Sequence, residues 1–514
     1  MKTRRLGKTN LQVSEIGFGG EWLERHSEEE GVELIHYASE QGINILDCWM
    51  PDAKSRDIIG NGIKENRDKW FIQGHIGSTL KDGQYYRTRD MKYVRPAFED
   101  LLKRLQTDYI DLGMIHYIDS EEEWDQIQHS DYMDYVMELK SSDVLHISFD
   151  EMSHDYHRFV YKIEHCEADW SVSDGLFESD YIEGFNNNPI EDYQNSINTT
   201  VLYTHYKLDI PNDKCRLKIS GNYRLTVYDE DNDNRKVLTV EFMVVESDMN
   251  VGLAVTSNTD IDLNESHQQL SMTLNYGEFS ITNPTEQIHT VITQNNRPES
   301  ARINVKPNIV NNKGLQWNHN KQLIFDAGNE YHKFEVLALS HPTMGIDRIS
   351  WDGHNYNAYP FVAEPRKNYL YDEDANGAFY IRNSDNIEND YTCDYVYVHY
   401  RLRSPELTGC NIAVNGQWAT DEDQSAYVMQ YDQANAEYQA TILQKQGYYS
   451  YRFITVDNNG ITGIPPTEGN FYQTENRYQA YVYYKGTGER TWRLVGYRQV
   501  EFRSDNPSAV SVGL

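Results

Sequence analysis

The spacing of hydrophobic residues changes once along this chain, close to residue 140, and this change restricts the possible folds more than any other feature. Before it, short apolar runs such as residues 43–46 alternate with helical patterns such as residues 94–106. After it, strand-length runs are separated by Asn, Asp and Gly about every 8–12 residues, which indicates β-sandwiches. Asn rises from 4 in residues 1–140 to 38 in residues 141–514, as expected where turns are frequent. The sequence therefore predicts two architectures in one chain.

The junction between the two patterns is short. Residues 135–139 have the spacing of a helix face, whereas residues 144–149 alternate as a β-strand does. The three residues between Lys140 and Val144 include no glycine or proline and form no linker run. We infer a fusion point between Lys140 and Asp143.

The first segment, residues 1–140, is expected to form a parallel sheet. Strand-like runs alternate with two amphipathic helical patterns, and one of these runs delivers Asp47 at its carboxyl end. The strand runs lie near residues 13–20, 43–46, 70–77 and 109–117. This alternation favours right-handed crossovers between parallel strands.

Charge and composition exclude several classes of partner. The net charge of −33 would be repelled by nucleic acid and by an anionic membrane surface. No stretch approaches the roughly 18 apolar residues of a membrane span. The first twenty residues are basic but lack an apolar segment and a cleavage site, so the chain as written is expected to stay in the cytoplasm. The five cysteines form no CxxC pair and indicate neither a zinc site nor a disulfide framework.

The second segment is expected to contain three β-sandwiches, at residues 141–246, 247–370 and 371–514. Residues 221–244 show the pattern most clearly, because two alternating apolar runs flank a polar turn, as in a hairpin. The sequence SDMNVGLAVTSN marks the boundary near residue 247, and strand patterns such as YVYVHYRL follow residue 371.

Two groups of potential metal ligands occur in the first of these sandwiches. The turn DEDNDN, residues 229–234, is rich in oxygen ligands but lacks the glycine and the final glutamate of a calcium loop. His154 and His157 are three residues apart and should point in different directions, and His165 lies on the next stretch. We therefore expect no metal site and no cofactor.

The motifs LGKTNLQVSEIGFGG, GINILDCW and FEDLLKRLQTDYIDLGMIHYID resemble the aldo-keto reductases over roughly residues 1–140. That family is an eight-stranded β/α barrel with its active site at the carboxyl ends of the strands. The resemblance implies the amino-terminal half of such a barrel, and it places Asp47 and His116 on the family's Asp and His. His75 stands where the family has Lys, and Asp52 lies near the position of its Tyr.

The resemblance also implies what is missing for catalysis. The family's Tyr donates the proton when hydride adds to a carbonyl, and its Lys lowers the pKa of that Tyr. The family's nicotinamide cofactor is held mainly by the second half of the barrel, which residues 141–514 do not resemble. Asp47, His75 and His116 are therefore expected to be vestigial matches, and an NADP-dependent reductase remains the alternative.

The motifs HRFVYKIEHCEADW, ESDYIEGF, YQNSINTTVLYTHY and SGNYRLTVYD resemble the plug protein of the Bacteroidetes type IX secretion system. The resemblance runs from about Ser142 almost to the carboxyl end. It implies a non-catalytic β-sandwich protein in the periplasm that closes the periplasmic end of the outer-membrane translocon when no cargo is crossing. The implied partner is the translocon protein.

The last predicted sandwich is similar to early-set immunoglobulin-like modules related to glycogen-binding domains. Trp418 is expected on an exposed turn there, so carbohydrate binding is a further alternative to packing. For protein contact, we expect the loop of residues 180–196 to project, with Phe185 and Tyr193 as the contact candidates. The predicted fold class is mainly β, with tandem immunoglobulin-like or early-set sandwiches preceded by an α/β half-barrel.

Overall fold

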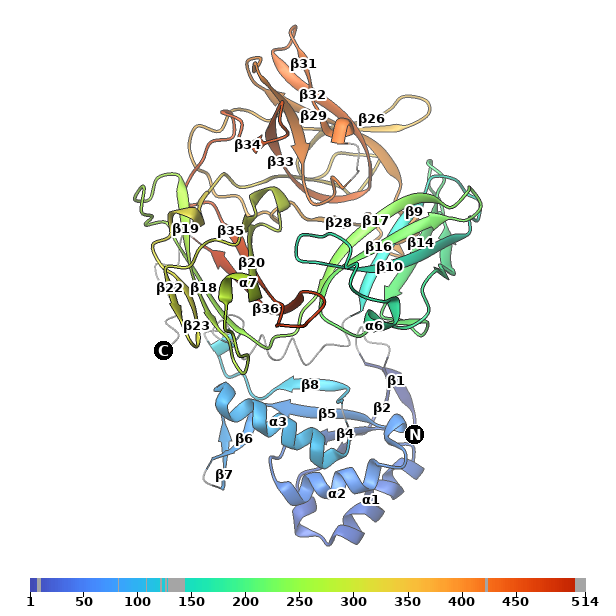
Figure 1. Cartoon of the computed structure of the whole chain (residues 1–514). Helices are drawn as coiled ribbons and strands as arrows, with labels where there is room; N and C mark the ends of the chain where they lie inside the picture. Colours follow the sequence, from blue (N-terminus) through green and yellow to red (C-terminus); the bar gives the residue numbers. More distant parts are fainter. Residues whose placement is uncertain are drawn as a thin grey trace. The chain divides into compact units, whose positions relative to one another are not determined.

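The computed structural model describes residues 1–6, 11–81, 83–107, 109–120, 123–124, 127, 144–420 and 424–503. The chain divides into two compact units, Met1–Asp143 and Val144–Leu514 (Figure 1). The helix pattern of residues 135–139 and the inferred fusion point lie outside the described residues. Within the described residues, no helix is both long and apolar enough to cross a membrane.

The first unit is built on a parallel sheet of four strands in the order β3-β4-β5-β8. The strands are β3 (Phe18–Gly19), β4 (Ile45–Cys48), β5 (Phe71–Ile76) and β8 (Leu112–Ile115). The helices are α1 (Glu28–Glu40), α2 (Ala53–Ile63) and α3 (Met91–Leu105), with 3-10 turns η1 (Leu23–Arg25) and η2 (Arg67–Lys69). Two antiparallel hairpins complete the unit, β1 (Thr3–Arg5) with β2 (Gln12–Ser14) and β6 (Ser78–Lys81) with β7 (Gln84–Arg87). The expected α/β half-barrel is confirmed.

Side-chain caps fix where these helices begin. Ser27 and Glu30 form a capping box at α1, and Asp52 and Asp90 accept backbone N–H groups at the starts of α2 and α3. Helices α2 and α3 meet at Gly60, where an added Cβ would lie 2.0 Å from the carbonyl oxygen of Arg104. Only a glycine permits this approach.

The alternation along the strands separates two faces of the sheet. Leu46 and Ile72 are buried in the core that the strands share with the helices. Asp47, Gln73 and His75 point to the opposite face and are half-buried. These three polar side chains therefore lie on the face of the sheet away from the hydrophobic core.

The described residues of the second unit form three large hydrophobic cores, which we call the first, second and third sandwich, and one smaller cluster. The main sheets of the first sandwich have the orders β12-β10-β16-β17 and β13-β14-β9. Its strands are β9 (Leu145–Glu151), β10 (Phe159–Cys166), β11 (Ile182–Gly184), β12 (Asn188–Pro189), β13 (Asp192–Asn195), β14 (Thr204–Ile210), β15 (Cys215–Leu217), β16 (Gly221–Asp229) and β17 (Arg235–Val244), with helix α6 (Glu178–Tyr181).

The second sandwich pairs a sheet of order β18-β19-β23-β22, with β24 also on β19, against a sheet of order β21-β20-β35-β36. Its strands are β18 (Asn250–Thr256), β19 (His267–Asn275), β20 (Ile288–Gln294), β21 (Arg302–Ile303), β22 (Ile309–Asn311), β23 (Gly314–Trp317), β24 (Ile324–Asp326), β35 (Asn476–Tyr484) and β36 (Arg493–Phe502). Short helical turns are α7 (Pro284–Gln287), η3 (Pro298–Ser300) and η4 (Lys321–Leu323).

The third sandwich lies in sequence between the two parts of the second. Its strands are β25 (His332–Val336), β26 (Ile346–Trp351), β27 (Tyr356–Pro360), β28 (Phe379–Ile381), β29 (Tyr395–Arg403), β30 (Cys410–Asn415), β31 (Gln430–Asp432), β32 (Glu437–Lys445), β33 (Gly447–Asp457) and β34 (Thr462–Gly463), with α8 (Asn389–Thr392) and η5 (Gln424–Tyr427). One sheet has the order β26-β27-β29-β32-β31, and the other is built around β33. A mainly β chain of sandwiches after an α/β half-barrel is the fold class that the sequence predicted.

The predicted domain boundaries differ from this arrangement in one respect. Residues 247–370 and 371–514 were expected as separate modules, but β25 to β27 belong to the third sandwich and β35 and β36 to the second. In Figure 1 the red strands β35 and β36 accordingly lie with the second sandwich and not with the orange third. The reason is core packing, since Phe334 is buried in the third core and Tyr478 in the second. Strand periodicity does not reveal which sheet a strand joins.

A buried carboxylate joins the first sandwich to the third. Asp150 on β9 accepts hydrogen bonds from His205 Nδ1 at 2.5 Å, Lys445 Nζ at 2.6 Å and the Tyr395 hydroxyl at 2.7 Å. The side chains of Asp150 and Lys445 are 6% and 7% exposed. Burial alone would raise the pKa of Asp150, but these hydrogen bonds together lower it below its usual range.

The other two joints also contain polar contacts, and the one between the first and second sandwich adds a small apolar cluster of Ala168, Tyr483 and Leu494. Between the first and second sandwich, the Tyr483 hydroxyl donates to Asn222 Oδ1 at 2.8 Å, and Thr491 Oγ1 donates to Glu167 Oε1 at 2.9 Å. Between the second and third, Glu330 Oε1 accepts from the Tyr369 hydroxyl at 2.6 Å and from the backbone N–H of Glu475, directly before β35, at 3.1 Å. Each of these contacts depends on the orientation of the hydrogen-bonding groups and therefore fixes the angle between neighbouring sandwiches.

The joint at Glu330 leads to a pH-dependent prediction. Burial raises the pKa of Glu330 from its ordinary value of 4.5 to about 7. The folded protein therefore holds more protons than the unfolded one between these values, and stability falls as the pH rises through that range. Glu330→Gln should raise the free energy of unfolding by about 3 kcal/mol at pH 8 and by little at pH 4.5. Urea unfolding at both pH values measures this difference. Glu278→Gln, at an exposed position, is the control. An equal gain in the free energy of unfolding from Glu330→Gln at both pH values would contradict the raised pKa of Glu330.

Candidate functional site

A chain of hydrogen bonds links the polar residues on the open face of the first unit. Asp47 Oδ1 lies 3.0 Å from His75 Nε2, and His75 Nδ1 lies 2.8 Å from His116 Nδ1. His116 Nε2 lies 2.6 Å from the Tyr85 hydroxyl. Gln73 Nε2 donates to Asp47 Oδ1 at 2.9 Å. The structure thus brings together Asp47, His75 and His116, the three positions that the sequence singled out.

Neighbouring elements deliver these side chains to one place. Asp47 and His75 lie near the carboxyl ends of β4 and β5, and His116 directly follows β8. Carboxyl ends of parallel strands meet at one edge of the sheet. Tyr85 comes from outside the sheet, on β7 of the β6–β7 hairpin.

The chemistry of the groups fixes one direction in this chain of hydrogen bonds. A carboxylate only accepts, so His75 donates from Nε2 to Asp47. The directions of the His75–His116 and His116–Tyr85 bonds depend on which ring nitrogens carry the protons. In either direction, the Tyr85 hydroxyl is engaged by His116.

Burial, with the nearby His75 and arginines, lowers the pKa of His116 to about 4, so this imidazole is neutral at pH 7. Burial also raises the pKa of Tyr85 above its ordinary value. The indole of Trp49 stacks on His116 at 5.7 Å between ring centroids and holds the imidazole in place. Tyr85 is consequently a weaker acid than a free phenol.

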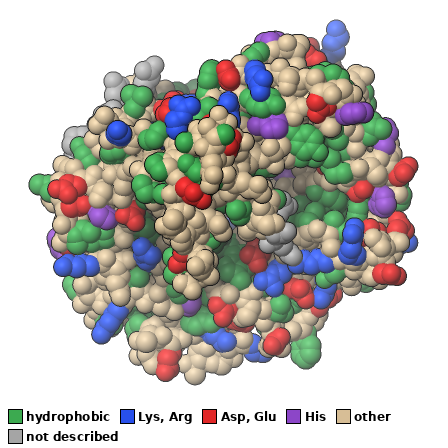
Figure 2. Space-filling model, turned by 90° about the horizontal axis from the view of Figure 1, so that it is seen from above, with side chains coloured by type: hydrophobic (Ala, Val, Ile, Leu, Met, Phe, Trp, Pro, Cys, Tyr) green, Lys and Arg blue, Asp and Glu red, His purple; other side chains and the backbone are tan. Residues whose placement is uncertain are grey.

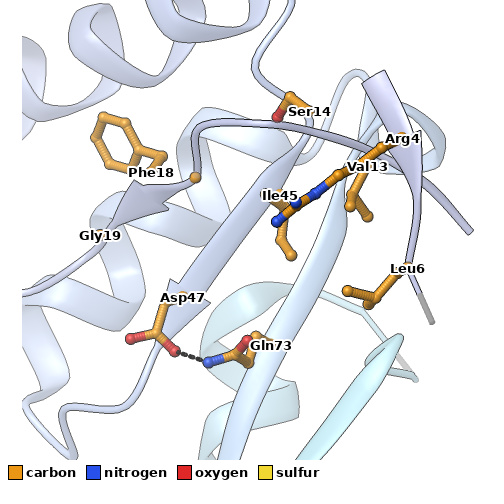
Figure 3. A pocket seen from close by; sticks show the side chains of 10 residues that line it. Arg4, Leu6, Val13, Ser14, Phe18, Gly19, Ile45, Asp47 and Gln73 are labelled. Carbon is orange, nitrogen blue, oxygen red and sulfur yellow. Dashed lines mark hydrogen bonds between the residues drawn. The ribbon is translucent and has the colours of Figure 1, made fainter. Parts of the chain in front are cut away.

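A cavity of about 350 Å³ opens on the same face of the sheet. Figure 3 shows Asp47 and Gln73 in its wall, joined by their hydrogen bond, with Arg4 and Val13 contributed by the β1–β2 hairpin. This volume suits a small ligand. Among the lining residues Arg4 is the single cation, so the lining does not match the two phosphates of a nicotinamide dinucleotide.

Asp52, at the position near the expected family tyrosine, caps α2 by accepting the Ser55 N–H at 2.8 Å and takes no part in the polar chain. Sequence reasoning missed Gln73, Tyr85 and Trp49. A signal for Tyr85 was present, because Asp82-Gly83 between two short polar and aromatic runs is a hairpin pattern. A hairpin predicted there, directly after β5, would have placed Tyr85 near the carboxyl ends of the parallel strands.

The interaction candidates of the second unit differ in their surroundings. Residues 180–196 do not form an open loop, because β11, β12 and β13 pair with neighbouring strands. Phe185 is 75% exposed. Tyr193 lies on β13, and its ring packs against Tyr156 at 4.8 Å and Tyr206 at 5.8 Å. Tyr193 therefore contributes to the sheet surface, and Phe185 remains available for contact.

The expectation that Trp418 lies on an exposed turn is wrong. Its indole N–H donates to the carbonyl oxygen of Ser450 at 3.1 Å, and its ring packs against Tyr400 and Tyr449 of the third core. The turn is present, but the ring folds back over the sandwich. A half-buried ring in this position offers no flat face for a sugar.

Comparison with known proteins identifies two families in this chain. The model of the type 9 secretion system plug protein 1st domain matches residues 120–246, and that of the aldo/keto reductase family matches residues 15–171. Two Bacillus subtilis proteins, the uncharacterized oxidoreductase YqkF and the aldo-keto reductase YhdN, are each 31% identical to 23% of this chain. Each match covers 39% of the relative, so the chain spans about two fifths of the length of these proteins.

A solved structure is similar over a larger part of the chain. The crystal structure of a hypothetical protein from Parabacteroides merdae is 36% identical and covers 71% of this chain and 92% of its own, with a TM-score of 0.68. The chain therefore belongs to the family of this Parabacteroides merdae protein, carries the first domain of the type 9 secretion system plug protein, and includes an aldo/keto reductase segment at residues 15–171.

Proposed function

We propose that the second unit is a non-catalytic protein-binding body that closes the periplasmic end of the type 9 outer-membrane translocon while no cargo is crossing. The observation that carries this proposal is the set of buried polar joints between the three sandwiches. A body that closes a pore must hold its shape against the pore wall. The match of residues 120–246 to the first domain of the plug protein supports the same role.

The joint at Asp150 contributes to this rigidity through a buried ion pair. Removing one partner of a buried ion pair typically costs about 3–5 kcal/mol, because the other charge is left buried without compensation. Asp394 adds a second link between the same sandwiches by accepting from Thr200 N and Thr200 Oγ1, both at 2.7 Å. The first and third sandwiches can therefore meet a partner as one surface.

Two exposed phenylalanines form the contact surface that we favour. Phe177 and Phe185 are 74% and 75% exposed. Their segments are joined, since Asn186 Nδ2 donates to Glu178 Oε2 at 3.0 Å. Figure 2 shows charged and hydrophobic side chains interspersed on the visible face of the molecule. Contact at Phe177 and Phe185 would depend on these two aromatic anchors.

We propose that the first unit has no carbonyl reductase activity. Tyr85 is the phenol of the polar chain, and its hydroxyl is hydrogen-bonded to His116. The cavity beside Asp47 lacks the cationic groups that a dinucleotide needs. The NADP-dependent reductase remains the alternative for this unit.

NADPH titration tests this alternative. Adding the full chain to NADPH should leave the fluorescence of the nicotinamide unchanged apart from dilution, because the lining of the cavity does not fit the cofactor. Tyr85→Phe is the matched variant, and it should behave identically. Saturable binding in the micromolar range, with turnover of an aldehyde that Tyr85→Phe abolishes, would show that the site is a reductase.

Copurification tests the role as a plug. The full chain, given a periplasmic signal peptide, should copurify with the outer-membrane translocon. Replacing both Phe177 and Phe185 by Ala should lower recovery about tenfold or more, since buried aromatic anchors dominate interface energies. Phe361→Ala removes an exposed phenylalanine of the third sandwich and should leave recovery unchanged. Failure of the parent chain to copurify would refute the plug proposal. Full recovery of the double variant would show that the contact surface lies elsewhere on the protein.

A further inference from the structure

Three potential metal ligands converge at one end of the first sandwich. His157, Asp229 and Asp231 each offer one nitrogen or carboxylate oxygen, and these three atoms all lie within 4.8 Å of one another. His157 precedes β10, Asp229 ends β16, and Asp231 lies in the turn between β16 and β17. The cluster therefore joins two segments that are about 70 residues apart in the sequence.

Strand register explains how they meet. Strands β10 and β16 are antiparallel, with Phe159 opposite Asp229, so the residues before β10 lie beside the turn after β16. The backbone N–H of Arg158 donates to Asp231 Oδ2 at 2.8 Å, and that of Glu230 donates to the carbonyl oxygen of Arg158 at 3.0 Å. These bonds hold His157 next to the two aspartates.

The burial of Asp229 is a second observation that points to a cation. Asp229 is 5% exposed, and none of the ion pairs among the described residues includes it. Its carboxylate accepts one N–H group, from Asp231 at 3.1 Å. The nearby Arg158 pairs with Glu230 instead, at 2.7 Å. A buried carboxylate without a cationic partner is costly, and a bound metal ion removes this cost.

The imidazole of His157 is equally available. Of the described residues, none forms a hydrogen bond with its ring. The centroid of this ring lies 6.1 Å from the ring centroid of Phe159. A cavity of about 270 Å³ is lined by all three ligands together with Glu151 and Arg235. The three carboxylates and the one guanidinium leave a net negative charge, as a divalent cation requires.

We propose that His157, Asp229 and Asp231 bind a divalent transition-metal ion, with Zn²⁺ as the representative ion. Imidazole nitrogen together with carboxylate oxygen suits zinc, whereas calcium prefers six to eight oxygen ligands. Three protein ligands leave the fourth position open toward the cavity, where a water molecule completes the coordination. The ion clamps the start of β10 to the β16–β17 turn.

Titration with zinc chloride tests the site on the full chain. Calorimetry should show saturable binding of Zn²⁺, and the ion should raise the unfolding temperature of the protein. His157→Gln and Asp231→Asn should each weaken this binding at least tenfold. Two matched controls, His154→Gln and Asp233→Asn, change the same residue types nearby and should keep the affinity within twofold. Asp231 is exposed, so its replacement leaves the core intact even if the other variant folds poorly.

Three results would overturn the proposal. Binding could be absent, it could persist unchanged in both ligand variants, or it could be lost equally in the two controls. Calcium chloride is titrated in parallel, and tighter binding of Ca²⁺ than of Zn²⁺ at these residues would refute the choice of a transition metal. Unfolding midpoints measured without metal establish that each variant is folded.

Discussion

The arrangement of the second unit depends on the carboxylate of Asp150. It lies on a strand of the first sandwich and receives hydrogen bonds from His205 of the same sandwich and from Tyr395 and Lys445 of the third. All three donors must be present, because a buried carboxylate and a buried ammonium are tolerated only when each compensates the other. Two sandwiches held by apolar contacts alone could rotate against each other by several degrees at little cost in free energy. This set of hydrogen bonds, in contrast, forms in one orientation.

The polar chain of the first unit shows the same principle with a different outcome. Asp47, His75, His116 and Tyr85 are hydrogen-bonded to one another in one chain. Judged by residue types alone, this site resembles a catalytic site. In three dimensions, the Tyr85 hydroxyl is already hydrogen-bonded to His116. Residue identity is therefore weaker evidence for activity than the hydrogen-bond partners of each residue.

Sequence patterns predicted the parts of the structure that depend on local chemistry. Strand-like runs that alternate with amphipathic helical patterns indicated the first unit, and the position at the carboxyl end of a parallel strand is enough to bring Asp47 and His116 together. Patterns could not assign β35 and β36 to the second sandwich, because alternation is identical in every sheet. They also could not show that Trp418 folds onto its core, or that His157 meets Asp229. Each of these facts depends on pairing between distant segments.

The insertion of the third sandwich into the second has a consequence for the newly made chain. About 150 residues separate β24 from β35, and the second core needs Tyr478, Ala480 and Val482 from the late strands. At about 5–20 residues per second, a ribosome takes on the order of ten to thirty seconds to add that stretch. Strand β20 must wait for β35 throughout this interval. The insertion thus delays the folding of the second sandwich, since its core cannot be completed before β35 and β36 have left the ribosome.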